Sequence, residues 1–172
     1  MSTAVASTPT APFSETTLAR FAREVAKYPA DKKQSAVMAC LAIVQQEQGW
    51  ISSESEQAVA DYLGMPPMAV HEVTTFYNMY NQQPVGRFKL VVCTNAPCMF
   101  AGGPEALKHL CDKLGIEPYG TTADGEFTVQ PCECLGACGD APVLLVNDRS
   151  MCSFMTDDRL DKLVDGLRAA ED

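Results

Sequence analysis

Two closely spaced pairs of cysteines are the residues of this chain with the clearest capacity for chemistry. Four residues separate Cys93 from Cys98, three separate Cys134 from Cys138, and 35 lie between the pairs. Each pair can present two thiolates from one loop, and thiolates are soft ligands that select iron-sulfur clusters, zinc or cuprous copper. The spacing departs from the two-residue gap usual in structural zinc sites. It therefore favours a binuclear iron-sulfur centre, with zinc as the alternative.

Small and turn-forming residues surround these cysteines. Asn95, Ala96 and Pro97 lie inside the first pair, and Gly136 and Ala137 lie inside the second. Such residues let backbone N–H groups approach sulfur atoms. These donors matter because four thiolates on two ferric ions leave a net negative charge that grows on reduction. The chain itself already carries a net charge of -9, so we expect backbone hydrogen bonds to compensate the site.

The other metal-binding residue types are expected to play lesser roles. Three thiols at helical or strand positions are predicted to be core residues, because free cysteine usually behaves as a small apolar side chain: Cys40, Cys111 and Cys152. Cys132 is ambiguous. It lies two residues before Cys134, so in a regular strand both side chains point the same way, and Cys132 either competes for iron or is a neighbouring spectator. His71 and His109 are isolated, and packing or surface roles are expected for them.

Composition restricts the classes of function. The chain has 172 residues, 47% of them hydrophobic and 20% charged, as in an ordinary globular protein. Its net charge of -9 repels nucleic acids and anionic lipid surfaces, which argues against binding to either. We expect no membrane insertion, since no apolar run approaches the 18 or so residues of a membrane span. Eight cysteines in a chain without a secretory signal indicate metal or redox chemistry.

The first part of the chain is predicted to be helical. Residues 1–13 are expected to form a disordered tail, and residues 14–81 a small bundle of helices. Ser14 can cap a first helix, and a second is predicted over residues 31–48. A capping-box pattern at residues 53–56 predicts a third helix, ending at Gly64. A fourth is predicted over residues 68–80, and its inner face is expected to consist of Val70, Val73, Phe76 and Tyr77.

The second part, residues 86–172, alternates between strand and helix patterns. Strands are predicted at 88–92, 127–129, 143–146 and 151–154, with helices over 103–114 and from a cap at Thr156. The first two strands lead into the two cysteine loops. This order of elements resembles the thioredoxin fold. The predicted fold class is therefore α+β, with a small N-terminal helical bundle followed by a thioredoxin-like domain that carries the candidate [2Fe-2S] centre.

Three segments together resemble one known family. The segments are 92–98 (VCTNAPC), 133–142 (ECLGACGDAP) and 71–77 (HEVTTFY). They are similar to the NuoE-type iron-sulfur subunit of respiratory NADH:quinone oxidoreductase, complex I, and the likeness extends from about Leu18 to Leu167. The resemblance implies one [2Fe-2S] cluster held by these four residues: Cys93, Cys98, Cys134 and Cys138. It also implies a NuoF-type partner subunit that binds FMN and NADH.

The expected function is thus electron transfer in the NADH-oxidising arm of that complex, at the cytoplasmic side and peripheral to the inner membrane. The chain is expected to be one subunit of an oxidoreductase, without a complete active site of its own. Gamma or diaphorase subunits of NAD-dependent formate dehydrogenases and NAD-reducing hydrogenases share the ligand pattern, and they remain an alternative. A structural zinc adaptor and a thiol-disulfide enzyme are alternatives of other classes, although no Cys-x-x-Cys motif opens a helix here.

Overall fold

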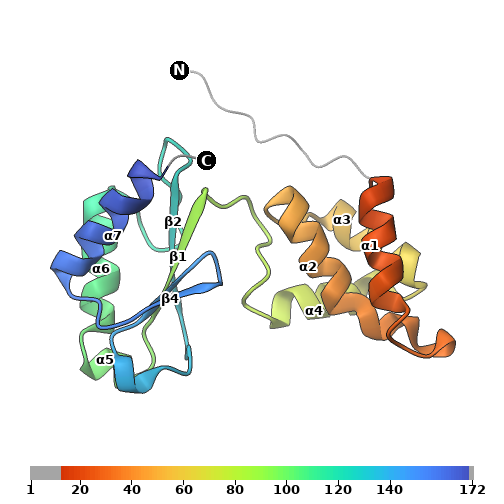
Figure 1. The fold of residues 1–172 in the computed structure, drawn as a ribbon, viewed down its shortest axis with the longest axis horizontal. Helices are drawn as coiled ribbons and strands as arrows, with labels where there is room; N and C mark the ends of the chain where they lie inside the picture. The colour runs from red at the N-terminus through yellow and green to blue at the C-terminus, as the bar shows by residue number, and fades with distance from the viewer. Residues whose placement is uncertain (1–12, 171–172) are drawn as a thin grey trace. The chain divides into compact units, whose positions relative to one another are not determined.

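The computed structural model describes residues 13–170, which divide into two compact units on either side of the Pro84–Val85 peptide (Figure 1). Most of the predicted tail, residues 1–12, lies outside the described range. Its last residue, Phe13, packs against the ring of Phe21, with 5.0 Å between the ring centroids, and so contributes to the helical core. No helix within residues 13–170 is long and apolar enough to cross a membrane.

The first unit is built from helices. Within residues 13–84 they are α1 (Glu15–Val25), the 3-10 helix η1 (Ala30–Ala36), α2 (Val37–Gln48), α3 (Ser53–Leu63) and α4 (Pro67–Phe76). Their apolar faces surround one core, whose largest fully buried side chains are Phe21, Leu41, Val44, Ile51, Val59, Leu63 and Val70. A helical bundle of this size depends on such shared burial, because short helices are marginally stable alone.

Local hydrogen bonds fix where these helices begin. Ser14 Oγ accepts a hydrogen bond from the backbone N–H of Thr17 at 3.1 Å, as predicted for the cap of α1. The cap of α3 is Ser52, whose Oγ accepts from the N–H of Ser55 at 3.2 Å. The capping box predicted at residues 53–56 was therefore wrong by one residue. The glutamate that it assigned to capping, Glu56, is buried and bonded to α4 instead.

Two predicted helices differ from the observed ones. Residues 31–48 do not form one helix, because Lys32 has φ -123° and the chain runs through η1 before α2 begins. In α4 the predicted inner face was wrong at its end: Val70 is buried, but Phe76 is 79% exposed. Successive residues turn by about 100° around a helix, so Phe76 lies on the side away from Val70, whereas Thr74 lies about 40° from it. Thr74 takes the inner position.

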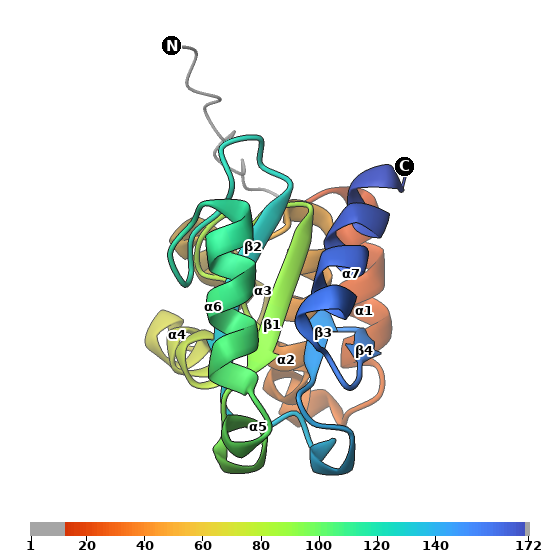
Figure 2. The same ribbon diagram turned by 90° about the vertical axis from the view of Figure 1, so that its left-hand side faces the viewer.

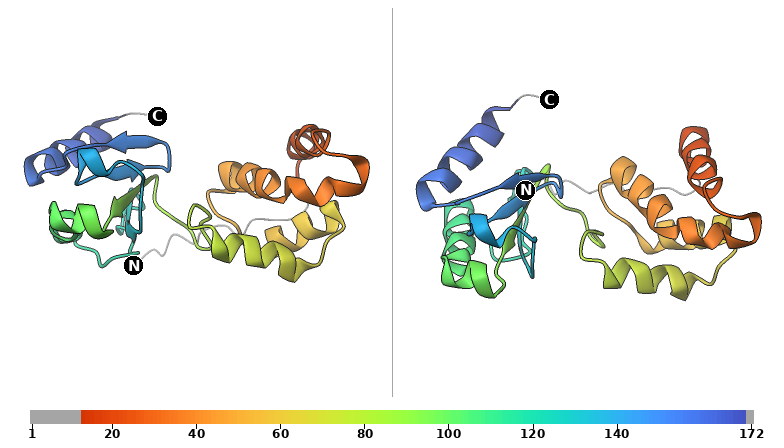
Figure 3. Two further views of the ribbon diagram at one scale, coloured as in Figure 1. Left: turned by 90° about the horizontal axis from the view of Figure 1, so that it is seen from below. Right: turned by 60° about the horizontal axis from the view of Figure 1, so that its bottom comes forward.

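The second unit is a sheet covered by helices on one face. Within residues 85–170 the strand order is β2-β1-β3-β4, with β1 and β2 parallel and the other pairs antiparallel. The strands are β1 (Phe88–Cys93), β2 (Phe127–Cys132), β3 (Leu144–Val146) and β4 (Ser150–Cys152). The helices α6 (Gly103–Leu114) and α7 (Asp157–Ala169) lie on the same side of this sheet (Figures 2 and 3).

Alternation along the strands builds the core of this unit. Leu90 and Val92 of β1 and Phe127 and Val129 of β2 point toward the helices, where they meet Leu110, Leu160 and Val164. Two short helices lie in the segments that carry the cysteines: α5 (Ala96–Phe100) and the 3-10 helix η2 (Cys138–Asp140). The short helix α5 was not predicted, and β2 extends three residues beyond its predicted end at Val129. This mixed four-stranded sheet with two helices on one face confirms the predicted α+β class.

Candidate metal centre

The two cysteine pairs lie at the same end of the sheet. Cys93 is the last residue of β1, and Cys98 follows it within α5. Cys134 lies in the loop after β2, and Cys138 begins η2. Because β1 and β2 are parallel, their C-terminal ends are adjacent, and α5 and η2 continue from that end (Figure 2). The fold thus brings together two loops that are distant in sequence.

The four thiols occupy two levels of burial. Cys93 and Cys98 are 3% and 1% exposed and pack with Val143, whereas Cys134 and Cys138 are exposed. Within residues 13–170, no three His, Cys, Asp or Glu side chains are grouped closely enough to hold a metal ion. A centre shared by the two loops would therefore join a buried pair of thiols to an exposed pair.

Hydrogen bonds already join the two loops. The Cys93 thiol donates to the backbone carbonyl of Glu133 at 2.9 Å, and Asn95 Nδ2 donates to the carboxylate of Glu133 at 2.9 Å. The N–H and the hydroxyl of Thr94 both donate to the carbonyl of Cys132, at 3.0 and 3.1 Å. These contacts hold the segment after β1 against the segment after β2, so the buried half of the site is preformed.

Backbone groups also approach the sulfur atoms, as the small loop residues predicted. The N–H of Gly136 donates to Cys134 Sγ at 3.4 Å, with Gly136 at φ 75° in the left-handed region that favours glycine. Gly103 is the tightest position nearby. A Cβ there would lie 2.5 Å from the carbonyl oxygen of Cys93 and 2.9 Å from that of Cys98. The sequence pattern predicted only a helix start at Gly103, although the pair Gly102-Gly103 was a signal of close backbone approach.

The environment raises the pKa of three thiols in or beside these loops, Cys98, Cys132 and Cys138. Burial, followed by the hydrogen bond with Cys93, raises the pKa of Cys98. Burial and then the charge of Cys93 raise the pKa of Cys132 to about 12. Partial desolvation, with Cys134 as the next cause, raises the pKa of Cys138. Since metal ligation requires thiolates, binding of a cationic centre would displace these protons and supply the missing positive charge.

The remaining candidate ligands lie elsewhere. Cys40 is fully buried in the helical core, and burial raises its pKa to about 12. Cys111 is a buried residue of α6, and Cys152 is half-buried in β4. Both histidines contact carboxylates: His71 Nδ1 lies 3.0 Å from Glu56, and His109 Nε2 lies 2.9 Å from Asp161. Cys132 alone among these residues packs against the buried thiols of the cysteine loops.

Comparisons with known proteins place this chain in a family. The model of the thioredoxin-like [2Fe-2S] ferredoxin family matches residues 21–168. A subunit of the NADH-quinone oxidoreductase of Thermus thermophilus is 42% identical over 146 residues, which are 85% of this chain and 81% of that protein. A subunit of the same enzyme from Rickettsia felis is 39% identical over 142 residues, which are 82% of this chain and 84% of that protein.

A solved structure shares the fold. The NAD+-reducing [NiFe]-hydrogenase in the H2-reduced state aligns over 80% of this chain and 23% of its own, with a TM-score of 0.66 and 23% identity. That likeness concerns the fold, whereas the curated relatives share both sequence and length with the chain. The chain therefore belongs to the thioredoxin-like [2Fe-2S] ferredoxin family, in its NuoE-type branch of NADH-quinone oxidoreductase subunits.

Proposed function

We propose that this chain transfers single electrons through one [2Fe-2S] cluster in the NADH-oxidising arm of NADH-quinone oxidoreductase. The proposed ligands are Cys93, Cys98, Cys134 and Cys138. The observation that carries the proposal is the meeting of two cysteine loops at the C-terminal ends of the parallel strands β1 and β2. A soft, four-thiol donor set on small, backbone-rich loops fits such a cluster.

The residues of the chain would hold and insulate the cluster. Cys93 and Cys98 provide the buried thiolates, and Val143 excludes water on their side. Cys134 and Cys138, on the exposed loop, would complete the ligand set. The N–H of Gly136 is already directed at Cys134 Sγ and would partly offset the negative charge of the reduced centre. When bound, the cluster supplies one-electron redox chemistry.

The proposed partner is a NuoF-type subunit that binds FMN and NADH, at the cytoplasmic side of the membrane. A flavin can accept two electrons from a nicotinamide and release them singly, which a binuclear cluster needs from its donor. The helical unit is proposed as the docking element. Its helix α4 and the residues after it expose a set of large apolar side chains: Met68 (65%), Phe76 (79%), Tyr77 (38%) and Met79 (40%). Such clusters mark interaction sites.

Metal and sulfide analysis of the reconstituted chain tests the proposal. We expect about two irons and two acid-labile sulfides per chain, and an electron paramagnetic resonance signal that appears on reduction. Stoichiometric zinc without iron would instead support a structural zinc adaptor. Disulfide reductase activity of the metal-free chain would support a thiol-disulfide enzyme.

The alternative assembly is an NAD-reducing hydrogenase or formate dehydrogenase. The hydrogenase structure shares the fold at 23% identity, whereas the quinone oxidoreductase subunits reach 42%. Purification of the native assembly through a tag on this chain separates these candidates. Quinone-dependent NADH oxidation in the purified complex is expected, and hydrogen- or formate-dependent reduction of NAD in its place would overturn the assignment.

A further inference from the structure

A fifth thiol adjoins the proposed cluster site. Cys132 ends β2 and is paired in parallel register with Cys93, which ends β1. Residues paired in this way direct their side chains to the same face of a sheet. Cys132 is half-buried, and its side chain packs against the buried side chains of Cys93, Cys98 and Val143. Its thiol is therefore on the buried side of the site, beside the two inner ligands.

Cys132 and Cys134 differ in how firmly they are held. The backbone of Cys132 is tied to the first loop by two hydrogen bonds from Thr94, at 3.0 and 3.1 Å. Cys134 is exposed and lies beyond the strand, in the loop that follows β2. One residue, Glu133, separates the two cysteines, and its carbonyl accepts a hydrogen bond from the Cys93 thiol at 2.9 Å. Cys132 is thus held at the end of the sheet, whereas Cys134 lies on the exposed loop.

We propose that Cys132 is a reserve ligand, able to replace Cys134 on the [2Fe-2S] cluster when Cys134 is lost. This inference rests on the proposed ligand set. With Cys134 absent, the Cys132 thiol would release its proton to solvent and would supply the fourth thiolate. No electron is transferred, and the charge of the site is unchanged.

The test compares cluster content in variants of the full-length chain. Cys134→Ala is expected to retain at least about half of the wild-type iron and sulfide, with a shifted resonance signal, because one thiolate has changed position. Cys132→Ala should match the wild type in content and signal. The double variant Cys132→Ala/Cys134→Ala should hold less than about a tenth of the wild-type iron and sulfide, because three thiolates leave one ligand position empty. Cys134→Ala/Cys152→Ala is the matched control and should behave like Cys134→Ala.

Two results would overturn the reserve role. One is a Cys134→Ala variant that holds as little iron and sulfide as the double variant. The other is a double variant that holds as much iron and sulfide as Cys134→Ala. Valine versions, which likewise carry no donor atom, repeat the comparison if alanine at 134 weakens the far-ultraviolet circular dichroism. Failure of the proposed function looks different, because the wild type itself would then lack iron and sulfide. If Cys132→Ala alone empties the site while Cys134→Ala gives the wild-type signal, Cys132 is the resident ligand and the reserve role is wrong.

Discussion

The ammonium nitrogen of Lys89 lies 2.5 Å from Oδ2 of Asp148, and only 3% of the Lys89 side chain is exposed. Lys89 belongs to β1, and Asp148 lies in the turn between β3 and β4. Beside it, Asn147 Oδ1 accepts the N–H of Lys89 at 2.7 Å. Asn147 and Asp148 have φ of 51° and 55°, the conformation of a tight hairpin turn. A buried charge on the strand that ends in Cys93 is therefore compensated by the hairpin beside it.

Replacing this partner should destabilise the second unit. Asparagine adopts positive φ as readily as aspartate, so Asp148→Asn removes only the charge that faces Lys89. We expect a loss of about 1 to 3 kcal/mol in the free energy of unfolding. Urea titrations followed by far-ultraviolet circular dichroism measure it. Asp112→Asn is the control: Asp112 also lies 2.5 Å from a lysine, Lys108, but those side chains are 66% and 75% exposed. It should cost less than about 0.5 kcal/mol, and equal losses would contradict the burial argument.

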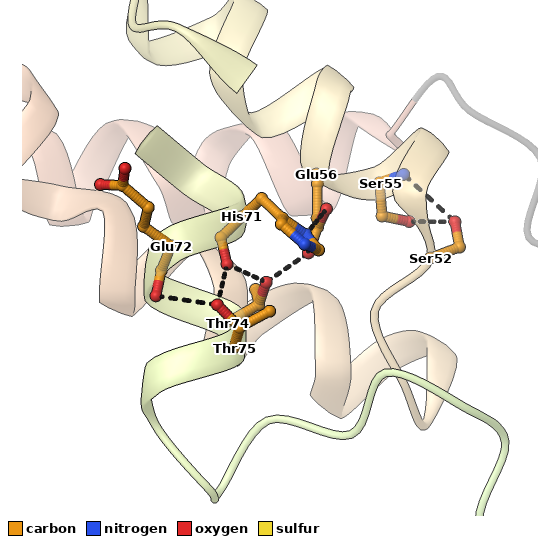
Figure 4. Close-up of polar contacts among 7 residues, drawn as sticks. All are labelled: Ser52, Ser55, Glu56, His71, Glu72, Thr74 and Thr75. Carbon is orange, nitrogen blue, oxygen red and sulfur yellow. Dashed lines mark hydrogen bonds and ion pairs between the residues drawn. The ribbon is translucent and has the colours of Figure 1, made fainter. Parts of the chain in front are cut away.

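A second prediction concerns the buried carboxylate of the helical unit. Glu56 of α3 accepts hydrogen bonds from the Thr74 hydroxyl and, at 3.0 Å, from His71 Nδ1 (Figure 4). Thr74→Val should lower the free energy of unfolding of this unit by about 1 to 2 kcal/mol, because a buried charged acceptor loses one of its hydrogen-bond donors and keeps only His71. The fluorescence of Trp50, the single tryptophan of the chain, reports its unfolding in urea.

Thr75→Val is the matched control for that prediction. Thr75 is exposed, and its hydroxyl donates to the carbonyl of His71 at 2.8 Å within the same helix. Its loss should change the free energy of unfolding by less than about 0.5 kcal/mol. A Thr75→Val effect as large as that of Thr74→Val would show that the contact with Glu56 is not what stabilises α4 on α3.

The acid sensitivity of the second unit provides a third prediction. Hydrogen bonds from His109 and then from Lys113 hold the pKa of Asp161 below its usual value. A lowered pKa means that its stabilising contribution is complete above the unfolded value, about 3.9, and disappears as the pH falls through the folded value. Asp161→Asn should therefore lower the urea midpoint at pH 7 and match the wild type well below about pH 3.9.

Asp165→Asn is the control for the acid prediction. Asp165 lies 3.6 Å from the same Lys113 and is 71% exposed, so its loss should shift the urea midpoint less than the loss of Asp161 does. A difference between Asp161→Asn and the wild type that persists unchanged at low pH would show that the carboxylate charge is not the cause.

The other three proposed ligands should be indispensable, in contrast to Cys134. Alanine at Cys93, Cys98 or Cys138 is expected to remove the cluster, because each change takes one thiolate from a closed set of four. The neighbouring thiol of Cys132 is separated from Cys134 by a single residue and is proposed to replace that residue alone. Alanine at Cys111 or Cys152, which lie outside this group of thiols, should leave iron and sulfide content unchanged. Measurement of both elements per chain decides the matter, and a full cluster in Cys98→Ala would remove Cys98 from the ligand set.

The sequence predicted those parts of the fold that local patterns determine. The strand predicted at 88–92, the cap at Ser14 and the helix end at Gly64 depend on neighbouring residues alone, and they were found as predicted. The errors arose where contacts between distant residues determine the structure. Glu56 satisfied a capping pattern, but its burial against α4 gave its carboxylate other donors. No rule based on neighbouring residues predicts that tertiary donors will bind this carboxylate in place of the helix cap.

The cysteine site shows the same division. Ligand spacing and loop composition pointed to the four cysteines, but no local pattern gives their levels of burial. The register of β1 against β2, which sets Cys132 beside Cys93, is a contact between residues 39 positions apart in number. The sequence pattern of Cys132 was therefore compatible with either a spectator or a competitor for iron. The parallel pairing places it on the inner side of the site.

Docking through the helical unit is the last prediction. Phe76 ends α4 with 79% of its surface exposed, so Phe76→Ser should leave the urea midpoint unchanged while weakening binding to the flavoprotein partner at least about tenfold, as loss of an apolar anchor does. Phe100, 86% exposed beside Cys98, gives the matched variant Phe100→Ser. Titration calorimetry with the purified partner compares the two. If Phe100→Ser weakens binding and Phe76→Ser does not, the face beside the cluster carries the interface and the helical unit is not the docking element.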